Sequence, residues 1–424
     1  MSSGLIPGSK TSFFAFPASK AKFSQQLGKS QLLSTLWYKS PSFNTESDGL
    51  NAPSTLPLDL KPKAEIFHEV EVENPNKTGI LLKVKQFGTY GKSLVKFYKK
   101  GVSNVWNNKK EFNKLMKKDF KIVNQLNNRG KQIDIRIPNF QKLTHVMSQA
   151  IYMNKIENST LNDNTRGDVI RSDVMEKKID EGLFNMTRYQ YQLIRRTRKD
   201  FLKLPTFAVI FAVFFEFTPV ICYAFPEITP STCILPSLVP RIWNANASKK
   251  LRDHRLQKKG EILEDLALRN SYNIPLDEAR LLCKALCLTS KYVPNILYPE
   301  TVIRGRLQLH YNYLKADNYY LSGLNGESSG NIWNLSQQEL FRACLERNLI
   351  LDLKQDIKNY DNIDDEATQK VYEEKYFAQL RFKLFHFIVD FEQYNIGYLG
   401  MNHLVKDNME TESLLSWWKQ DNIK

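Results

Sequence analysis

The feature of this sequence that most constrains its fold is an apolar run of 22 residues, Leu204 to Phe225. Glu216 is the one charged residue in the run, and Pro205 and Pro219 stand near its two ends. As an α-helix, such a run extends about 33 Å, which is enough to cross the hydrocarbon layer of a bilayer, roughly 30 Å thick. The run therefore predicts a transmembrane segment with Glu216 at hydrocarbon depth.

A carboxylate at that depth is costly unless it is protonated, paired or open to water. Because desolvation raises the pKa of carboxyl groups, a group in this position can exchange protons near neutral pH. Pro219 has no N–H to donate, so in a helix the carbonyl of Phe215 would be free to coordinate a cation. Two interpretations stay open. Glu216 and Pro219 form a candidate transport site, or Glu216 is a protonated group that joins helices in an oligomer.

The net charge of +15 is concentrated before the apolar run. Residues 61–128 contain 15 Lys and Arg against 6 Asp and Glu, whereas residues 361–424 contain 7 against 12. A basic balance fits nucleic acid, anionic lipid or a ribosome, and does not choose among them. Five basic residues flank the N-terminal side of the run: Arg195, Arg196, Arg198, Lys199 and Lys203.

The rest of the chain has the periodicity of helices. Between Ile80 and Phe120 apolar residues recur mostly every three or four positions, which predicts one or two long amphipathic helices. Twelve lysines lie between Lys83 and Lys121, on a face that is either solvated or in contact with an anionic membrane. Ser336 and Glu339 form a capping-box pattern at the start of a later helix. No useful strand alternation appears, so we predict an all-α, membrane-anchored protein.

The N-terminal residues 1–45 have no Asp or Glu, five lysines and many Ser and Phe. This composition is typical of a mitochondrial transit peptide, with a disordered basic tail as the alternative. The sequence then predicts five consecutive segments. They are a transit peptide at 1–45, a linker at 46–78, a basic amphipathic helical region at 79–200, a transmembrane segment with a proline-rich exit at 201–240, and a soluble helical domain at 241–424.

Three stretches resemble the Letm family, a family of mitochondrial inner-membrane proteins with a leucine zipper, an EF-hand and a transmembrane segment. The least specific of them is "FGTYGKSLVKF", which is similar to the family's aromatic-Gly…Lys-Leu entry. "YQLIRRTRKDFLKLPTFAVIFAVFFEFTPVICYAFPEITPST" is similar to the family signature, and "LSQQELFRACLERNL" is similar to a helix of its ribosome-binding-like domain. Asn348 stands where that family has Gly, and Asn also suits a left-handed helix end. No EF-hand loop or heptad zipper is present, so the chain resembles a short member. The motif residues are Pro205, Pro226, Pro230, Ser231 and Thr232.

The resemblance implies a mitochondrial inner-membrane protein whose C-terminal domain faces the matrix. It implies a part in potassium/proton exchange, with Glu216 handling the proton or cation. The alternative is a membrane-anchored receptor for the mitochondrial ribosome that supports protein insertion. The implied partners are inner-membrane lipids, potassium ions and protons, the mitochondrial ribosome, and further copies of the chain. The basic N-terminal flank also favours the matrix, so the segment would have to be re-entrant or paired.

Motifs of enzymes are missing from the sequence. The six histidines and five cysteines show no metal-ligand spacing, and no G-x-S-x-G, Walker or dinucleotide-binding motif occurs. We therefore predict a protein that is not an enzyme, with no catalytic residues, no metal site and no cofactor.

Overall fold

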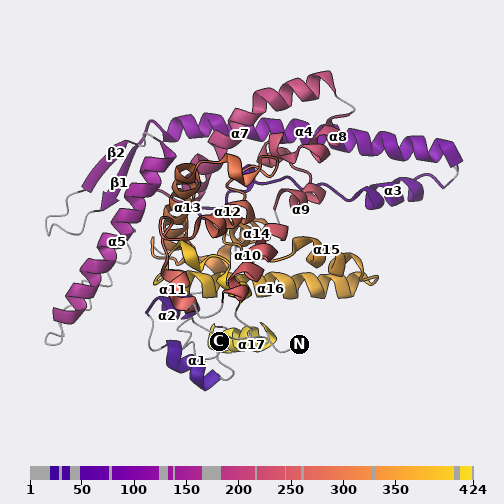
Figure 1. Cartoon of the computed structure of the whole chain (residues 1–424). Helices are drawn as coiled ribbons and strands as arrows, with labels where there is room; N and C mark the ends of the chain where they lie inside the picture. Colours follow the sequence, from indigo (N-terminus) through magenta and orange to yellow (C-terminus); the bar gives the residue numbers. More distant parts are fainter. Residues whose placement is uncertain are drawn as a thin grey trace. The chain divides into compact units, whose positions relative to one another are not determined.

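The computed structural model of the chain describes residues 20–27, 31–38, 48–75, 79–123, 132–136, 139–164, 183–214, 217–243, 245–258, 262–325, 330–404 and 411–422. These residues are mostly helical (Figure 1), which confirms the expected predominance of α-helix. They divide into two compact units. Unit 1 consists of Met1–Asn51, Lys118–Gln190 and Trp243–Lys424, and unit 2 consists of Ala52–Lys117 and Tyr191–Ile242. The five consecutive segments expected from the sequence stay a prediction.

Unit 1 contains most of the elements. They are α1 (Lys20–Leu27), α2 (Gln31–Tyr38), β1 (Asp119–Val123), β2 (Gln132–Arg136), α5 (Phe140–Asn164), α10 (Ala245–Gln257), α11 (Leu263–Leu268), α12 (Leu276–Ala285), η7 (Asn295–Leu297), α13 (Glu300–Leu321), η9 (Ile332–Asn334), α14 (Gln337–Glu346), α15 (Leu353–Asp361), α16 (Glu366–Phe391), η10 (Ile396–Tyr398), η11 (Met401–His403) and α17 (Thr411–Asn422).

Unit 2 is built from two long helices and a series of short turns. Its elements are η1 (Pro53–Thr55), α3 (Lys63–Val72), α4 (Gly79–Leu115), α8 (Thr218–Ala224), η4 (Pro226–Ile228), η5 (Ser231–Cys233), η6 (Pro236–Leu238) and α9 (Val239–Ile242), together with α7 (Arg188–Val213), whose first residues belong to unit 1. The predicted long amphipathic helix is confirmed as α4, a single helix of 37 residues.

A β-hairpin is the exception to the all-α prediction. β1 and β2 pair antiparallel with Ile122 opposite Ile133. In β1 the alternate residues Phe120 and Ile122 are buried, and the Phe120 ring stacks on Phe184 at 6.0 Å between centroids. The alternation covers only five residues in each strand, which is too short to distinguish it from a loop in the sequence alone.

The predicted helix start at Ser336 is confirmed, although only half of the capping box forms. The Ser336 hydroxyl accepts a hydrogen bond from the backbone N–H of Glu339 at 3.3 Å. The Ser336 N–H donates instead to the side chain of Asn51 at 2.9 Å, which leaves the Glu339 carboxylate for another partner. At the other end of α14, Asn348 has φ = +54°, so the expected left-handed helix end is also confirmed.

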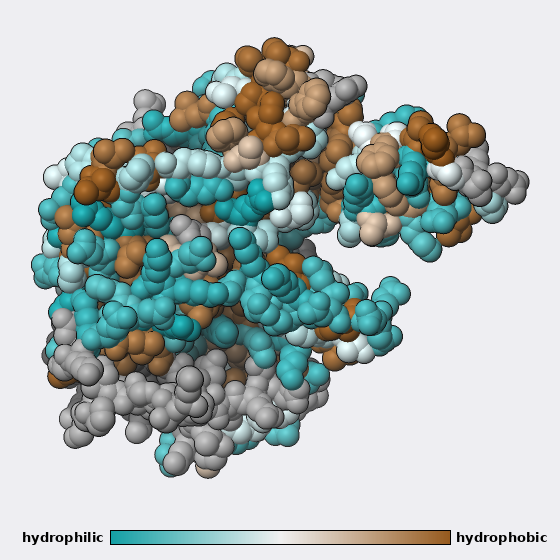
Figure 2. All heavy atoms as spheres, turned by 45° about the vertical axis from the view of Figure 1, so that its right-hand side comes forward, coloured by the Kyte–Doolittle hydropathy of each residue, from teal (hydrophilic) through white to brown (hydrophobic). Residues whose placement is uncertain are grey.

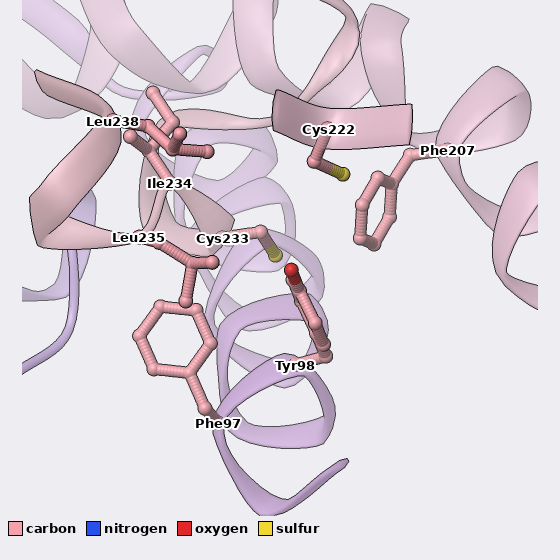
Figure 3. Packing of buried hydrophobic residues seen from close by; sticks show 8 residues of the cluster. All are labelled: Phe97, Tyr98, Phe207, Cys222, Cys233, Ile234, Leu235 and Leu238. Carbon is pink, nitrogen blue, oxygen red and sulfur yellow. The ribbon is translucent and has the colours of Figure 1, made fainter. Parts of the chain in front are cut away.

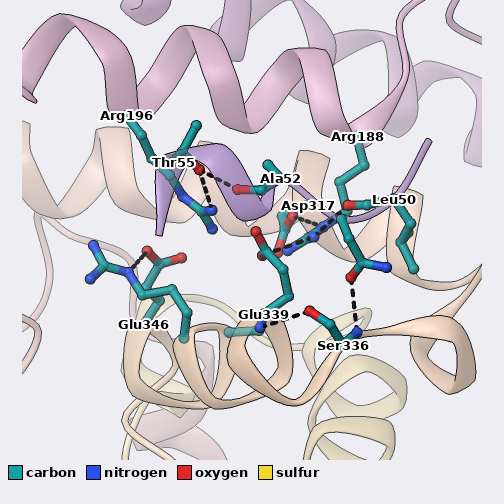
Figure 4. Close-up of polar contacts among 12 residues, drawn as sticks. Leu50, Ala52, Thr55, Arg188, Arg196, Asp317, Ser336, Glu339 and Glu346 are labelled. Carbon is teal, nitrogen blue, oxygen red and sulfur yellow. Dashed lines mark hydrogen bonds and ion pairs between the residues drawn. The ribbon is translucent and has the colours of Figure 1, made fainter. Parts of the chain in front are cut away.

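The Glu339 carboxylate belongs to a buried cluster of charged side chains in unit 1 (Figure 4). Arg188 contacts Asp317 at 2.7 Å and Glu339 at 3.2 Å, and Arg347 contacts Asp317 at 2.7 Å. Burial alone would raise the pKa of the Asp317 carboxyl, but the two guanidinium groups outweigh it and lower the pKa to about 2. Because every member is paired, the cluster fixes α13 and α14 to the start of α7 as a structural network.

The first two helices are part of the unit 1 core. Trp37 of α2 is fully buried, and its Nε1 donates to Asp421 of α17 at 3.0 Å. Trp333 Nε1 donates to the carbonyl of Leu36 at 2.6 Å. The predicted transit peptide at 1–45 covers both helices. It stays a prediction, but removal of α2 would leave Trp333 without this acceptor.

The expected transmembrane helix is wrong. The apolar run is divided between α7, which ends at Val213, and α8, which begins at Thr218 with Pro219 in its first turn. A proline favours the start of a helix and removes a helical hydrogen bond elsewhere, so the break lies where the sequence places Pro219. Across the residues with a described placement, no helix has both the length and the apolar character needed to span a membrane.

The contribution of α2 can be tested with two neighbouring residues. We expect Trp37→Ala to lower the free energy of unfolding by about 3–5 kcal/mol, because it empties a fully buried site. Tyr38→Ala is the control, since Tyr38 is 55% exposed and should change stability by no more than about 0.5 kcal/mol. Chemical denaturation followed by far-UV circular dichroism measures both. Equal effects of the two substitutions would contradict the placement of α2 in the core.

Candidate functional site

Unit 2 carries most of the positive charge of the chain. Its two segments contain 19 Lys and Arg against 9 Asp and Glu, which gives +10 of the total +15. Such a charge attracts anionic surfaces and polymers. Unit 2 is therefore the part of the chain that is best suited to an anionic partner.

The two long helices of unit 2 pack antiparallel. The ring of Tyr98 in α4 lies 5.8 Å from that of Phe207 in α7, whereas Trp106, two turns later in α4, lies 6.2 Å from Phe201. Later residues of α4 therefore lie beside earlier residues of α7. The helices form a pair whose seam is lined by aromatic rings.

A buried cluster joins this helix pair to the segment that follows it (Figure 3). The cluster consists of Phe97, Tyr98, Phe207, Cys222, Cys233, Ile234, Leu235 and Leu238. Burial raises the pKa of the Cys233 thiol to about 12 and also raises that of Tyr98. Both groups therefore stay protonated at neutral pH, and the cysteines act as small apolar residues with no nucleophilic role.

The segment after the apolar run approaches α4 very closely at Gly101. The hydroxyl of Thr232 donates to the Gly101 carbonyl at 3.0 Å. A Cβ atom at position 101 would lie 2.7 Å from the Cys233 sulfur and 3.0 Å from the Thr232 carbonyl oxygen. Only glycine leaves room for this contact, so Gly101 permits the chain to fold back onto α4.

The motif residues identified in the sequence have structural roles here. Pro226 and Pro230 are buried in the short turns η4 and η5, and Ser231 is held by the Asp200 carboxylate. Asp200 accepts hydrogen bonds from the Ser231 N–H at 3.0 Å and from its hydroxyl at 2.9 Å. Pro205 lies within α7 without ending it, with its side chain exposed. The contacts of Ser231 and the burial of Pro226 and Pro230 shape the turn.

The predicted basic flank is only partly available to a partner. Arg196 is buried and donates to the Thr55 hydroxyl at 3.0 Å (Figure 4), and Lys203 donates to the Thr229 carbonyl at 3.2 Å. The other three basic residues are less enclosed. Arg195 is half-buried, and Arg198 and Lys199 are exposed.

The candidate transport site, Glu216 with Pro219, stays a prediction, because the structure describes only one of its two residues. Glu216 lies outside the described residues. Pro219 is half-buried in the first turn of α8, where it starts a helix. No group of three or more His, Cys, Asp or Glu side chains in the described ranges is placed to hold a metal ion.

The most unusual feature of unit 2 is a set of exposed apolar side chains at the end of α7 and along α8. Figure 2 shows apolar atoms gathered at the top of the view, over these two helices. Their side chains are between 48% and 66% exposed, and no charged residue lies among the described positions 206–225. We call this the apolar surface: Val209, Val213, Phe214, Phe217, Val220, Tyr223 and Phe225.

An arginine and a tyrosine lie at the edge of the apolar surface. The guanidinium of Arg241 lies over the ring of Tyr223, with its carbon 3.3 Å from the ring centroid, and hydrogen-bonds to the tyrosine hydroxyl. Tyr and Arg are the residue types found where hydrocarbon meets water, because each has an apolar body and a polar end. The edge of the surface therefore has the chemistry of an interface.

The sequence did not indicate the roles of Gly101 and Trp106, and it identified Asp200 only as part of the stretch that resembles the Letm signature. Gly101 and Asp200 act through contacts with residues more than 30 positions away, which no local pattern reveals. Trp106 is 52% exposed at the seam of α4 and α7. A lone tryptophan in an amphipathic pattern normally indicates a buried position, so its exposure could not be foreseen.

A family comparison covers most of the described structure. Residues 50–322, which are 273 of the 424 residues, match the model of the pentamidine resistance factor domain (PNT1). The match includes all of unit 2 and residues 50–51, 118–190 and 243–322 of unit 1. No curated protein and no solved structure matches the chain.

The resemblance to the Letm family is wrong, because the matching family is a different one. The functions inferred from it are wrong with it: potassium/proton exchange through Glu216, and reception of the mitochondrial ribosome. Many of the residues that carried the resemblance are prolines and small polar residues around an apolar run. Any chain that must end an apolar helix and turn back can use such residues.

The close approach at Gly101 can be tested by comparison with Gly88 in the same helix. Both Gly→Ala changes add the same helix propensity, but a Cβ at Gly88 meets nothing within 4 Å. We expect the free energy of unfolding of Gly101→Ala to be lower than that of Gly88→Ala by about 1–3 kcal/mol, the cost of overpacking. Denaturant titration measures the difference. Equal stability of the two variants would refute a tight contact between α4 and η5.

Proposed function

This chain belongs to the pentamidine resistance factor domain family, and we propose that unit 2 anchors it to one side of a membrane. The single observation that carries the proposal is the apolar surface of α7 and α8. Neither helix spans the bilayer in this proposal. They lie in the interface and bury apolar side chains at the boundary of headgroups and acyl chains, about 5–10 Å deep.

The size of the apolar surface supports membrane insertion. Seven large side chains are each about half exposed or more. Moving the exposed part of each into hydrocarbon contributes about 1 kcal/mol, or on the order of 7 kcal/mol together. A Kd of about 1 μM corresponds to about 8 kcal/mol. The binding free energy of the apolar surface is smaller than this once the ordering costs are subtracted, so the association with the membrane is reversible. A contiguous apolar patch on a monomer commonly marks such an interaction site.

Two further observations support a mitochondrial location. The acid-free composition of residues 1–45 is typical of a mitochondrial presequence. Unit 2, with its net charge of +10, suits the matrix face of the inner membrane, because positive segments prefer that side. We therefore propose lipids of the inner membrane as the partner. Since α1 is packed in unit 1, processing would leave Lys20 and the residues after it in place.

The proposal predicts that charges on the apolar surface abolish membrane binding. In flotation assays with phosphatidylcholine vesicles, we expect the double variant Val213→Asp, Val220→Asp to bind at least about tenfold more weakly than the unmodified chain. A carboxylate costs about 2.5–3.5 kcal/mol at the centre of a bilayer and less at the interface. The matched control is the double variant Ile296→Asp, Val371→Asp in unit 1, since Ile296 and Val371 are 78% and 64% exposed against 66% and 62% for the two valines.

The alternative to a membrane is a second copy of the chain on the apolar surface. Sedimentation of the full chain without lipid separates the two. If the double variant floats with vesicles as well as the control does, but changes from oligomer to monomer, the anchoring function is refuted and the surface is an oligomer interface.

A further inference from the structure

The solvent face of α4 carries a straight stripe of exposed side chains, of which only Trp106 contacts another described helix of the unit. The stripe follows steps of three and four residues, so all its members lie on one side of the helix. They are Lys92, Lys96, Lys99, Ser103, Trp106, Lys110 and Lys114, and all seven are exposed. We call this the lysine stripe. It covers 23 residues of α4, and its two ends are about 33 Å apart along the helix.

The lysine stripe lies opposite the packed face of α4. The buried residues of the helix include Phe97, Gly101, Val105 and Asn108, which follow the same three- and four-residue steps on another side. Asn108 donates to the Ser54 carbonyl at 2.8 Å, so this other side faces the turns of unit 2. The lysines are therefore not needed to hold the unit together.

No carboxylate neutralises the stripe in the part of the chain that the structure describes. The single acidic residue of α4, Glu111, is half-buried and lies about 100° around the helix from Lys110. The five stripe lysines have no ion pair among the salt bridges of the described residues. Like charges at such spacing repel one another, at a cost of a few tenths of a kcal/mol per pair. A row of this kind is more stable next to an anionic partner.

Trp106 connects the lysine stripe to α7. Its ring is exposed but touches Phe201 of α7, so the stripe runs along the seam of the helix pair. On α7 the positions 205, 208 and 212 continue from Phe201 by steps of four, three and four, and all three side chains are exposed. They are Pro205, Ala208 and Ala212, and they contain no charge. The stripe thus borders uncharged side chains that lead to the apolar surface.

We propose that the lysine stripe binds the phosphate headgroups of anionic phospholipids in the membrane on which unit 2 is anchored. The inference rests on the proposed function, since it assigns the lipid class and the orientation of the same surface. Both α4 and α7 then lie parallel to the membrane plane, with lysines at the headgroups and apolar side chains below them. Trp106 lies between the two, at the depth that tryptophan prefers.

A bilayer fits this arrangement better than a nucleic acid. Phosphates of a nucleic acid would satisfy the lysines but leave the adjacent apolar side chains in water. Binding of single strands also depends on several stacking aromatic side chains, and the stripe has one. A planar anionic surface, in contrast, meets five lysines in line and takes up the apolar residues beside them.

The test compares two triple variants of the full chain with the same change in net charge. One is Lys96→Gln, Lys99→Gln, Lys110→Gln in the stripe. The control is Lys354→Gln, Lys358→Gln, Lys370→Gln in unit 1, where all three lysines are also exposed. Binding is measured on vesicles of phosphatidylcholine alone and of phosphatidylcholine mixed with phosphatidylglycerol. Circular dichroism melting checks that each variant is folded.

We expect phosphatidylglycerol to strengthen binding of the unmodified chain and of the control. The stripe variant should lose about fivefold for each lysine on the anionic vesicles, or about a hundredfold in total. Its binding to phosphatidylcholine should not change, because the apolar surface is intact. Salt at about 1 M should remove the advantage of the anionic vesicles, since it shortens the Debye length from about 10 Å to about 3 Å.

Three results would overturn the inference. The first is an equal loss for the stripe variant and the control, which would make the effect one of net charge. The second is no loss for the stripe variant while Val213→Asp, Val220→Asp still abolishes binding, in which case the anchoring function stands alone. The third is loss of binding to a single-stranded oligonucleotide without loss on anionic vesicles, which would assign the stripe to nucleic acid.

Discussion

The interruption of the apolar run between α7 and α8 decides how the rest of unit 2 is built. An unbroken helix over Leu204 to Phe225 would be as long as a bilayer is thick. Instead α7 ends at Val213, and α8 starts five residues later with Pro219 in its first turn. The chain can then turn back and place residues 226–242 against α4, and the long apolar run becomes part of a surface.

The returning segment is fixed by polar contacts as much as by apolar ones. Short turns expose backbone groups that must find partners when they are buried. Asp200 accepts from the backbone N–H of Ser231 and also from its hydroxyl, and the Gly101 carbonyl accepts from the hydroxyl of Thr232. Because the turns occupy one side of both long helices, the other side of each helix remains outside. On α7 that side is apolar, and on α4 it is lined with lysine.

The sequence was sufficient for the helices whose signals are local. The periodicity of α4, the cap at Ser336 and the left-handed end at Asn348 are each set by residues within a few positions. The contacts that define the candidate site are not local. Nothing near Gly101 indicates that Thr232 will lie against it, and Asp200 holds Ser231 from 31 positions away. The apolar run is long enough to span a bilayer, but Pro219 lies at the start of a second helix and the run is not one continuous helix.

The two surfaces of the helix pair act over different distances. Apolar contact begins only when water is displaced, whereas lysines sense an anionic surface over about 8–10 Å at moderate salt. In the proposed arrangement the lysine stripe therefore orients α4 before any apolar side chain is buried. The aromatic contacts between Tyr98 and Phe207 and between Trp106 and Phe201 fix α7 beside α4. When α4 is oriented on the membrane, α7 is oriented with it and contacts the membrane along its side. A helix pair of this kind therefore stays on the membrane without a transmembrane helix.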